Sequence, residues 1–269
     1  MMRERAIGFL DSGIGGLSVL KEVKKILPQE SVKYFADNKR QPYGSKNRKQ
    51  IEAYVLQIIK FLLKQGIKAC VIACNTATAT GIERAKAHFD IPIIGVIKPG
   101  AEAVARETKN SIIGIIATEF TIKNKIYQKE IKKFTPHIKI FANSCPKFTP
   151  LVEAGKFDDF QTYQIAKEYL NPLKRAKIDV LLLGCTHYPF LNKVISETIG
   201  PEVKLINPAI NTARVLKEEL KIRGLLKKNG NPTDIYYTTG SLRKVKKITE
   251  ILIGTQNITI LKINLEENG

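Results

Sequence analysis

The chain has no tryptophan, two methionines and three histidines among its 269 residues. It also lacks any apolar run approaching the roughly 20 residues that a membrane-spanning helix needs. Residues 1–13 carry charge and too short an apolar run for a secretory signal peptide. The composition, 43% hydrophobic and 26% charged, is that of a folded globular protein. We therefore expect a soluble, cytoplasmic protein that does not associate with membranes.

Acidic residues are scarce relative to basic ones, with 25 Asp and Glu against 44 Lys and Arg, which gives a net charge of +19. Such a charge favours anionic partners such as an acidic metabolite, nucleic acid or a membrane surface. The lysines are dispersed along helix-like segments, which is typical of a solvated surface. Binding of nucleic acid stays one hypothesis, and it predicts affinity that falls steeply with salt. The absence of tryptophan and of any nucleic-acid-binding motif counts against it.

Cysteines are also few: Cys70, Cys74, Cys145 and Cys185, with no C-x-x-C pair. In a cytosolic protein, packing or chemistry explains such free thiols better than a disulfide framework does. A metal site built from Cys74, Cys185 and His187 is conceivable. Structural zinc sites usually show two closely spaced pairs of ligands, which this sequence lacks, so we expect no metal.

Short β-branched runs alternate with amphipathic, lysine-rich stretches. The runs predict strands at 6–11, 31–37, 68–74, 91–96, 111–117, 137–142, 178–184, 203–207, 234–239 and 258–263. Helices are predicted at 15–27, 47–65, 76–88, 99–108, 119–134, 158–174, 189–199, 209–224 and 241–253. Continuous apolar strands with helices between them indicate an α/β protein whose parallel sheets are covered on both faces.

Two strand ends resemble each other, because "ACNTAT" and "GCTHYP" both place a cysteine and small polar residues after an apolar run. Ligands of open α/β sheets bind at the carboxyl ends of the strands. The duplicated pattern predicts two similar three-layer α/β domains with largely parallel sheets, pseudo-symmetric, with the active site in the cleft between them. We expect residues 1–96 plus 209–269 to form the first domain and 97–208 the second.

The residues after these strands suggest chemistry. A thiol at a helix start feels the positive end of the helix dipole, which favours the thiolate of Cys74. The same N–H groups, with the side chains of Asn75 and Thr76, could hold a carboxylate. Cys185 repeats this arrangement before Thr186, and His187 gives it a titratable neighbour.

Other cysteines and loops have simpler interpretations. A free cysteine is more often buried packing than a reactive group, and we assign Cys70 and Cys145 to the core. The glycine-rich turn at 11–16 is neither a dinucleotide fingerprint nor a P-loop, and alone it indicates a strand–helix turn capped by Asp11.

Six segments in order nevertheless give the chain a specific resemblance that covers nearly its whole length. They are "FLDSGIGGLSVL" (9–20), "YFADNKRQPYG" (34–44), "ACNTAT" (73–78), "GVIKPGA" (95–101), "CPKFTPLVEAG" (145–155) and "LGCTHYP" (183–189). With these segments the chain resembles the glutamate racemases of the aspartate/glutamate racemase superfamily. It departs from their pattern at Ala117, where glycine is frequent, and at Asn207, where aspartate is frequent.

The resemblance implies interconversion of L- and D-glutamate without a cofactor, by two bases on opposite faces of Cα. It implies that Cys74 serves the D-enantiomer and Cys185 the L-enantiomer, with Asp11 and His187 as their respective catalytic neighbours. The amino acid would be bound by the residues of the same loops: Asp11, Ser12, Tyr43, Gly44, Asn75, Thr76, Thr186 and His187. The position near Thr118 and Thr121 would line the substrate pocket.

His187 also indicates which amino acid is the substrate. Similar aspartate racemases tend to carry glutamate at that position, so the resemblance favours glutamate over aspartate as the substrate. The resemblance further implies a homodimer, a supply of D-glutamate for peptidoglycan, and, from the short amino terminus, no activation by a cell-wall precursor. An aspartate or broad-specificity racemase remains the main alternative. A pyridoxal-dependent racemase is a further one, although no lysine stands out as its Schiff-base residue.

Overall fold

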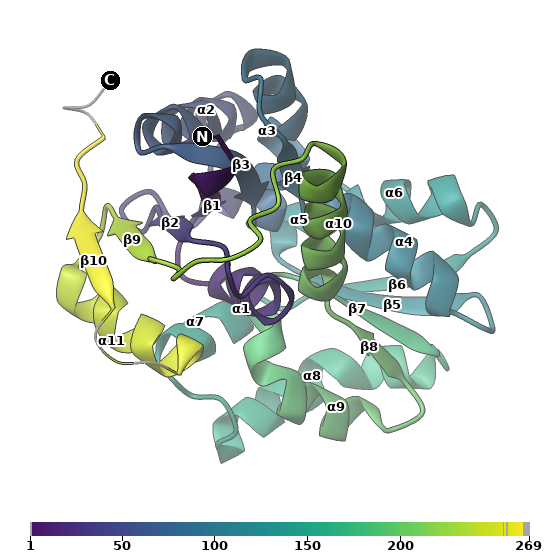
Figure 1. Ribbon diagram of the computed structural model, residues 1–269. Coiled ribbons are helices and arrows are strands. Elements are labelled where there is room, and N and C mark those ends of the chain that lie inside the picture. Colours follow the sequence, from purple (N-terminus) through teal and green to yellow (C-terminus); the bar gives the residue numbers. More distant parts are fainter. Residues whose placement is uncertain (1, 255, 257, 266–269) are drawn as a thin grey trace.

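The structure, a computed structural model, describes residues 2–254, 256 and 258–265. In this part of the chain two parallel sheets are packed between helices (Figure 1). A six-stranded sheet has the order β10-β9-β2-β1-β3-β4, and a four-stranded sheet has the order β6-β5-β7-β8. The predicted α/β class with largely parallel sheets is confirmed, although the two sheets differ in size.

All ten predicted strands are present, shifted by a residue or two at their ends. They are β1 Ala6–Asp11, β2 Val32–Ala36, β3 Ile67–Ile72, β4 Ile93–Gly95, β5 Ile112–Ala117, β6 Lys139–Ser144, β7 Val180–Gly184, β8 Lys204–Ile206, β9 Ile235–Thr238 and β10 Thr259–Lys262. Every residue of β1, β3 and β7 is buried, as expected for strands covered on both faces. β6 lies at a sheet edge and is only partly buried.

The helices are α1 Leu17–Ile26, α2 Arg48–Lys64, α3 Asn75–His88, α4 Ile97–Glu107, α5 Glu119–Lys123, α6 Ile126–Phe134, α7 Phe148–Glu153, α8 Phe160–Arg175, α9 Asn192–Ile199, α10 Pro208–Ile222 and α11 Leu242–Ile253, with short 3₁₀ helices at Met2–Glu4, Tyr43–Ser45 and Tyr188–Leu191. None of these helices is long and apolar enough to cross a membrane.

Two helix predictions need correction, and one helix was not predicted. The single helix expected at 119–134 is two, α5 and α6, because Lys125 adopts a left-handed conformation with φ 53°. The helix expected at 189–199 starts with the 3₁₀ turn Tyr188–Leu191 and continues as α9. α7 was not predicted, since it is only six residues long and contains Pro150.

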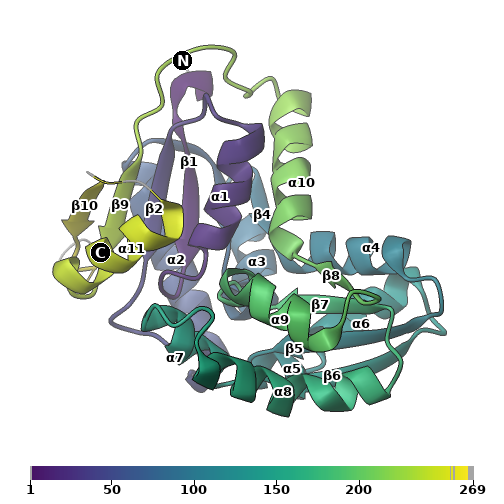
Figure 2. The same ribbon diagram turned by 90° about the horizontal axis from the view of Figure 1, so that it is seen from below.

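The half of the molecule built on the six-stranded sheet and the half built on the four-stranded sheet lie one above the other in Figure 2. α10 contacts α1 of the larger half and α4 of the smaller half. Apolar side chains of these helices, among them Leu20, Val104 and Leu216, belong to one continuous buried cluster. The predicted domain boundaries, 1–96 plus 209–269 and 97–208, stay predictions, and residues 266–269 lie outside the described residues.

Parallel strands deliver their carboxyl ends to one edge of each sheet. β1 ends at Asp11, β3 at Ile72, β5 at Ala117 and β7 at Gly184. The segments that follow these four strands all line the same cavity. The fold therefore brings the strand ends of both sheets to one site.

Candidate active site

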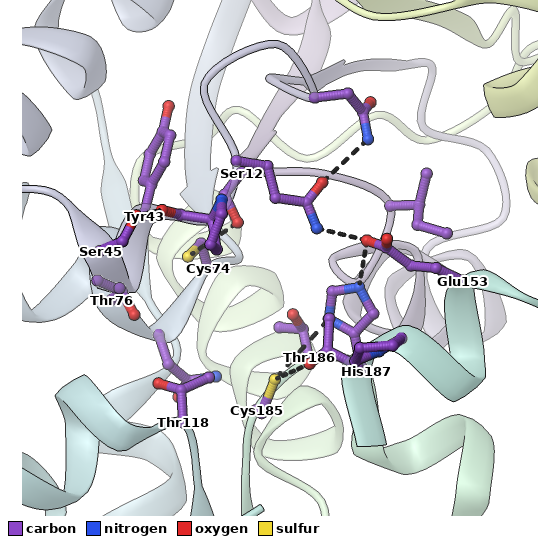
Figure 3. Close-up of a pocket in the computed structure, with 18 of the residues that line it drawn as sticks. Ser12, Tyr43, Ser45, Cys74, Thr76, Thr118, Glu153, Cys185, Thr186 and His187 are labelled. Carbon is purple, nitrogen blue, oxygen red and sulfur yellow. Dashed lines mark hydrogen bonds and ion pairs between the residues drawn. The ribbon is translucent and has the colours of Figure 1, made fainter. Parts of the chain in front are cut away.

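A cavity of about 690 Å³ lies between the two halves. It is lined by strand-end loops, by α7 and by α11: Ser12, Ile14, Asn38, Gln41, Pro42, Tyr43, Gly44, Ser45, Cys74, Asn75, Thr76, Thr118, Glu119, Phe120, Pro146, Thr149, Pro150, Glu153, Cys185, Thr186, His187, Gly240, Ser241, Lys244, Val245 and Ile248. We call it the central cavity. In Figure 3, Cys74 lies on one side with Ser12, and Cys185 lies across from it with Thr186 and His187.

Cys74 occupies the position just before α3, as the sequence predicts, with an extended backbone. Its Sγ lies 3.6 Å from Ser12 Oγ. Burial, and then the carboxylate of Asp11, raise the pKa of Cys74 to about 12, although hydrogen bonds from the Ala77 N–H and from Ser12 oppose them. Without a further positive charge, Cys74 is therefore a protonated thiol at neutral pH.

Cys185 follows β7, and its Sγ lies 3.8 Å from His187 Nδ1 and 4.0 Å from Thr149 Oγ1. The expectation that Cys185 stands directly before a helix, as Cys74 does, is wrong. A 3₁₀ helix begins at Tyr188, and His187 is the residue that precedes it. The positive partner of Cys185 is thus the imidazole of His187 rather than an α-helix dipole.

His187 is buried, and its Nε2 lies 3.5 Å from Glu153 Oε1. Burial opposes the charged imidazolium, but the contact with Cys185 and the ion pair with Glu153 outweigh it and raise the pKa of His187 to about 10. The imidazole is therefore protonated at neutral pH, with Cys185 on one ring nitrogen and Glu153 on the other.

Glu153 is a site residue that the sequence analysis did not assign. Burial would raise its pKa, but His187, a hydrogen bond from Gln41 and the charge of Lys244 outweigh that effect and hold the pKa below its usual value. Glu153 is therefore a carboxylate that stabilises the imidazolium. It stands inside the quoted segment "CPKFTPLVEAG", which is the only signal in the sequence that could have identified it.

Asp11 lies behind the wall of the cavity and does not line it, since its exposed fraction is zero. Its Oδ1 accepts a hydrogen bond from the Gly13 N–H at 2.9 Å, and its Oδ2 accepts one from the Thr186 hydroxyl at 3.4 Å. Burial raises the pKa of Asp11. Asp11 therefore links the loop after β1 to the loop after β7, and its electrostatic influence extends to both Cys74 and His187.

The glycine-rich turn after β1 packs directly against the opposite loop. A Cβ on Gly15 would lie 2.5 Å from both His187 Nδ1 and Thr186 Oγ1. Only glycine leaves room for this approach, because real Cβ atoms do not come so close to other heavy atoms. The turn thus serves close contact between the two halves, in addition to the sharp change of chain direction.

Four of the predicted binding residues line the cavity with polar groups: Ser12, Asn75, Thr76 and Thr186. Tyr43 and Gly44 line it too, but the Tyr43 hydroxyl donates to Asp37 Oδ2 at 2.5 Å instead of facing the space between the sulfurs. Burial and Asp37 raise the pKa of Tyr43. Its ring is directed away from Cys74 and Cys185 (Figure 3). Backbone groups of Tyr43 and Gly44 are what this turn can offer a ligand.

The remaining residues singled out in the sequence differ in whether they line the central cavity. Thr118 lines the cavity, and its hydroxyl lies 3.1 Å from that of Thr121, which does not line it. Cys70 and Cys145 are buried outside the cavity, as core residues should be. The wall formed by α11, with Lys244, Val245 and Ile248, has no strand-end signal and was not predicted.

The arrangement permits proton transfer on two sides of one molecule. Two thiols from opposite walls face a shared space, and each has a charged side chain nearby. Carboxylates can be held by amide and hydroxyl donors around the thiols. Within residues 2–254, 256 and 258–265, no three His, Cys, Asp or Glu side chains converge as metal ligands.

Comparisons with known proteins agree with this picture. Residues 10–216 match the family model of the Asp/Glu/Hydantoin racemases. A glutamate racemase of Geobacter metallireducens is 45% identical over 87% of this chain and 86% of its own length. A glutamate racemase isoform of Bacillus anthracis superposes with a TM-score of 0.92 at 38% identity, covering 97% of this chain and 98% of its own. A glutamate racemase of Francisella tularensis, solved in complex with D-glutamate, gives a TM-score of 0.91 at 35% identity, covering 98% and 99%.

The fold, the facing loops and these matches define an amino-acid racemase, and the chain belongs to the Asp/Glu/hydantoin racemase family. Within that family it is placed among the glutamate racemases, which confirms the resemblance inferred from the six sequence segments. The protein is therefore an isomerase that acts on a small-molecule substrate.

Proposed function

We propose that the protein interconverts L- and D-glutamate by a two-base mechanism that needs no cofactor. The observation that carries the proposal is the placement of Cys74 and Cys185 on opposite walls of the central cavity. Racemisation removes the α-proton from one face of the amino acid and delivers a proton to the other face. Two proton carriers on opposite sides of Cα meet that requirement.

In one direction, the Cys74 thiolate takes the α-proton of D-glutamate while the Cys185 thiol gives its proton to the opposite face. Once L-glutamate has formed, Cys74 is a thiol and Cys185 is a thiolate. The reverse reaction restores the Cys74 thiolate and the Cys185 thiol. The Ser12 hydroxyl and the Ala77 N–H favour the Cys74 thiolate. The substrate ammonium adds the positive charge that offsets burial and Asp11.

His187 assists Cys185 on the opposite wall of the central cavity. As an imidazolium 3.8 Å from Cys185 Sγ, it stabilises a thiolate there and can return a proton to it. Glu153 keeps the imidazole protonated and oriented. Asp11 influences both sides from behind the wall. The proposed catalytic set is Cys74, Cys185, Asp11 and His187, and Glu153 positions His187.

Glutamate is the proposed substrate because the relatives with 40–45% identity over most of this chain are glutamate racemases, and the Francisella tularensis relative was solved with D-glutamate. The chain also keeps His187, where similar aspartate racemases tend to carry glutamate. The proposed contacts to the polar ends of glutamate come from the side chains of Ser12, Asn75, Thr76 and Thr186 and from the backbone of Tyr43 and Gly44.

Proton NMR in deuterated water tests this function. We expect the purified protein to remove the Cα proton signal of both glutamate enantiomers, and a Cys74→Ala/Cys185→Ala double variant to leave both signals intact. Cys70→Ala is the matched control, because Cys70 lies in the core four residues before Cys74. Exchange of aspartate but not glutamate would contradict the substrate assignment. Exchange that survives in the double variant would contradict the assignment of the bases.

The biological role we propose is supply of D-glutamate for bacterial peptidoglycan in the cytoplasm. A bacterial strain that requires D-glutamate tests it. Expression of the wild-type chain should restore growth without D-glutamate, whereas the double cysteine variant should not. If the wild-type chain is expressed and soluble but does not restore growth, the proposed role is contradicted.

Two further proposals concern assembly and cofactors. We propose a homodimer. Light scattering after size-exclusion chromatography tests it by measuring the molar mass, which is 30.1 kDa for one chain.

An absorbance scan of the active, purified protein should show no bound pyridoxal. A pyridoxal band that disappears together with activity on dialysis would contradict the cofactor-free proposal.

A further inference from the structure

Tyr127 reaches the site from the opposite half of the molecule. It belongs to α6, packs in the core with an exposed fraction of zero, and places its hydroxyl 2.6 Å from Asn75 Oδ1. Asn75 opens α3, directly follows Cys74 and lines the central cavity. One buried hydrogen bond therefore joins the smaller half to the binding wall of the larger half, beside a proposed base.

The ring of Tyr127 has little freedom to move. A Cβ on Gly184 would lie 3.2 Å from ring atom Cε2, and a Cβ on Gly100 would lie 3.3 Å from Cε1. The ring thus fits closely between α4 and the end of β7, in the space that two missing side chains leave. Its hydroxyl is fixed by packing as well as by the hydrogen bond.

The chemistry of the pair fixes the orientation of the amide. A separation of 2.6 Å is typical of an O–H···O bond and short for an N–H···O bond. Burial, and then the nearby Cys185, raise the pKa of Tyr127, so the hydroxyl keeps its proton. The hydroxyl donates and Oδ1 accepts, which leaves Nδ2 as the end of the amide available to a ligand. In the described part of the chain Nδ2 has no protein acceptor.

We propose that Tyr127 is a positioning residue for substrate binding: it locks the Asn75 amide so that its two N–H donors face the cavity and hold a carboxylate of the amino acid. This inference rests on the proposed glutamate racemisation. An unlocked amide could rotate and offer its oxygen to the substrate ammonium instead. With the lock in place, donors alone face the substrate near Cys74, so Asn75 selects the carboxylate and sets the direction in which the amino acid binds.

Tyr127→Phe tests the lock, because it removes the hydroxyl and keeps the ring between the glycines. We expect the KM for both glutamate enantiomers to rise about ten-fold, with kcat changed less than about three-fold. Calorimetric titration with D-glutamate should show the same loss of affinity. The matched control is Tyr169→Phe, which removes a tyrosine hydroxyl that accepts from the Lys147 N–H away from the cavity and should leave KM unchanged.

A double-mutant cycle separates positioning from packing. Asn75→Ala should itself raise KM, and Tyr127→Phe should add no further rise in that background, because its target is gone. Asn75→Asp gives a readout that does not depend on removing a core hydroxyl. It keeps an acceptor for Tyr127 but replaces the donors with a carboxylate oxygen, and affinity should fall by more than about 100-fold.

Several results would overturn the inference. One is a KM for Tyr127→Phe within two-fold of wild type, and another is a rise in KM that is equally large in the Asn75→Ala background. A fall in kcat with unchanged KM would assign Tyr127 to proton transfer instead. A wild-type protein that neither binds nor turns over glutamate would overturn the proposed function and this inference with it. Wild-type turnover with an unaffected Tyr127→Phe overturns the inference alone.

Discussion

Cys74 and Cys185 share a cavity but have different electrostatic partners. Cys74 has the negative charge of Asp11 nearby, whereas Cys185 lies beside the imidazolium of His187. The protein alone therefore does not provide two equivalent bases, and the charged groups of the substrate complete the surroundings of Cys74. This asymmetry can be measured residue by residue.

The first prediction concerns Asp11, whose charge contributes to the raised pKa of Cys74 after burial. In a Cys185→Ser background, Asp11→Asn should lower the pKa of Cys74 and increase the thiolate fraction. Alkylation of Cys74 by iodoacetamide at pH 8, followed by mass spectrometry of the peptide, should be about three-fold faster or more. An unchanged or slower rate would show that Asp11 does not act on Cys74 through its charge.

The second prediction concerns His187, whose folded-state pKa of about 10 lies above its ordinary value of 6.5. A group with a raised pKa stabilises the folded state below its unfolded pKa, and this stabilisation is lost as the pH rises through the folded value. The difference in unfolding free energy between wild type and His187→Gln should therefore be largest near pH 6 and shrink between pH 7 and pH 10. Urea titrations across this range measure it, and a difference that grows with pH would contradict the charged imidazole.

The third prediction concerns Gly15, where an added Cβ would meet His187 and Thr186 at 2.5 Å. Gly15→Ala should push the two facing loops apart and reduce kcat/KM by about 100-fold, because small misplacements at a reacting centre are costly. Gly66→Ala is the control. Its φ of 78° strains an alanine, but no atom lies within 4 Å of the new Cβ, so stability should fall while activity stays.

At this scale the sequence allowed much of the site to be predicted, because strand-end residues must meet at one sheet edge. Cys74, Cys185, His187 and Thr186 come together as expected. Glu153 was missed because it follows no strand and reaches His187 only through the packing of α7. The direction of the Tyr43 hydroxyl was also unpredictable, since its partner Asp37 is a matter of side-chain rotamers.

Among the elements, strands were predicted better than helices. A buried parallel strand is a continuous apolar run, as in β1, β3 and β7. All ten strands were predicted to within two residues at each end. The break at Lys125 is a single left-handed residue in a lysine-rich stretch and leaves no trace in the apolar pattern. α11 was predicted as a helix at 241–253, but only the folded chain shows that it covers the central cavity.

The fourth prediction belongs to α11. Lys244 lines the cavity and contributes positive charge near Glu153. Because Lys244 is exposed, its attraction for an acidic substrate is screened by salt. Lys244→Ala should raise KM for glutamate about two- to three-fold at low ionic strength, and this effect should nearly vanish in about 0.5 M salt. Lys246→Ala on the same helix, which pairs with Glu250 outside the cavity, is the control and should leave KM unchanged.

For the whole molecule, the end of the larger sheet opposite the site is held by a buried ion pair. Lys68 Nζ lies 2.5 Å from Glu30 Oε2, and both side chains are fully buried. Lys68 also donates to the Arg3 carbonyl oxygen, and Glu30 accepts from the Lys227 N–H. The pair thus joins the amino terminus, the strands and the loop before β9.

The fifth prediction follows from that pair. Lys68→Met leaves Glu30 as an uncompensated buried charge and should cost about 3–5 kcal/mol of unfolding free energy. Lys68→Met combined with Glu30→Gln should recover part of the loss, because neither residue is then charged. Urea unfolding measures both, and the kcat of the folded variants should match wild type. A single substitution that costs less than about 1 kcal/mol would contradict a stabilising role for the pair.

The central claim, that two cysteines act as separate bases on opposite faces of glutamate, is tested most directly by isotope transfer in the first moments of the reaction. Protiated L-glutamate is mixed with the protein in deuterated water, and both enantiomers are separated and analysed by mass before a tenth has reacted. Two bases predict that the new D-glutamate carries deuterium at Cα while the remaining L-glutamate keeps its proton. New D-glutamate that retains the original proton would show that one group carries it between the faces, and would contradict the account.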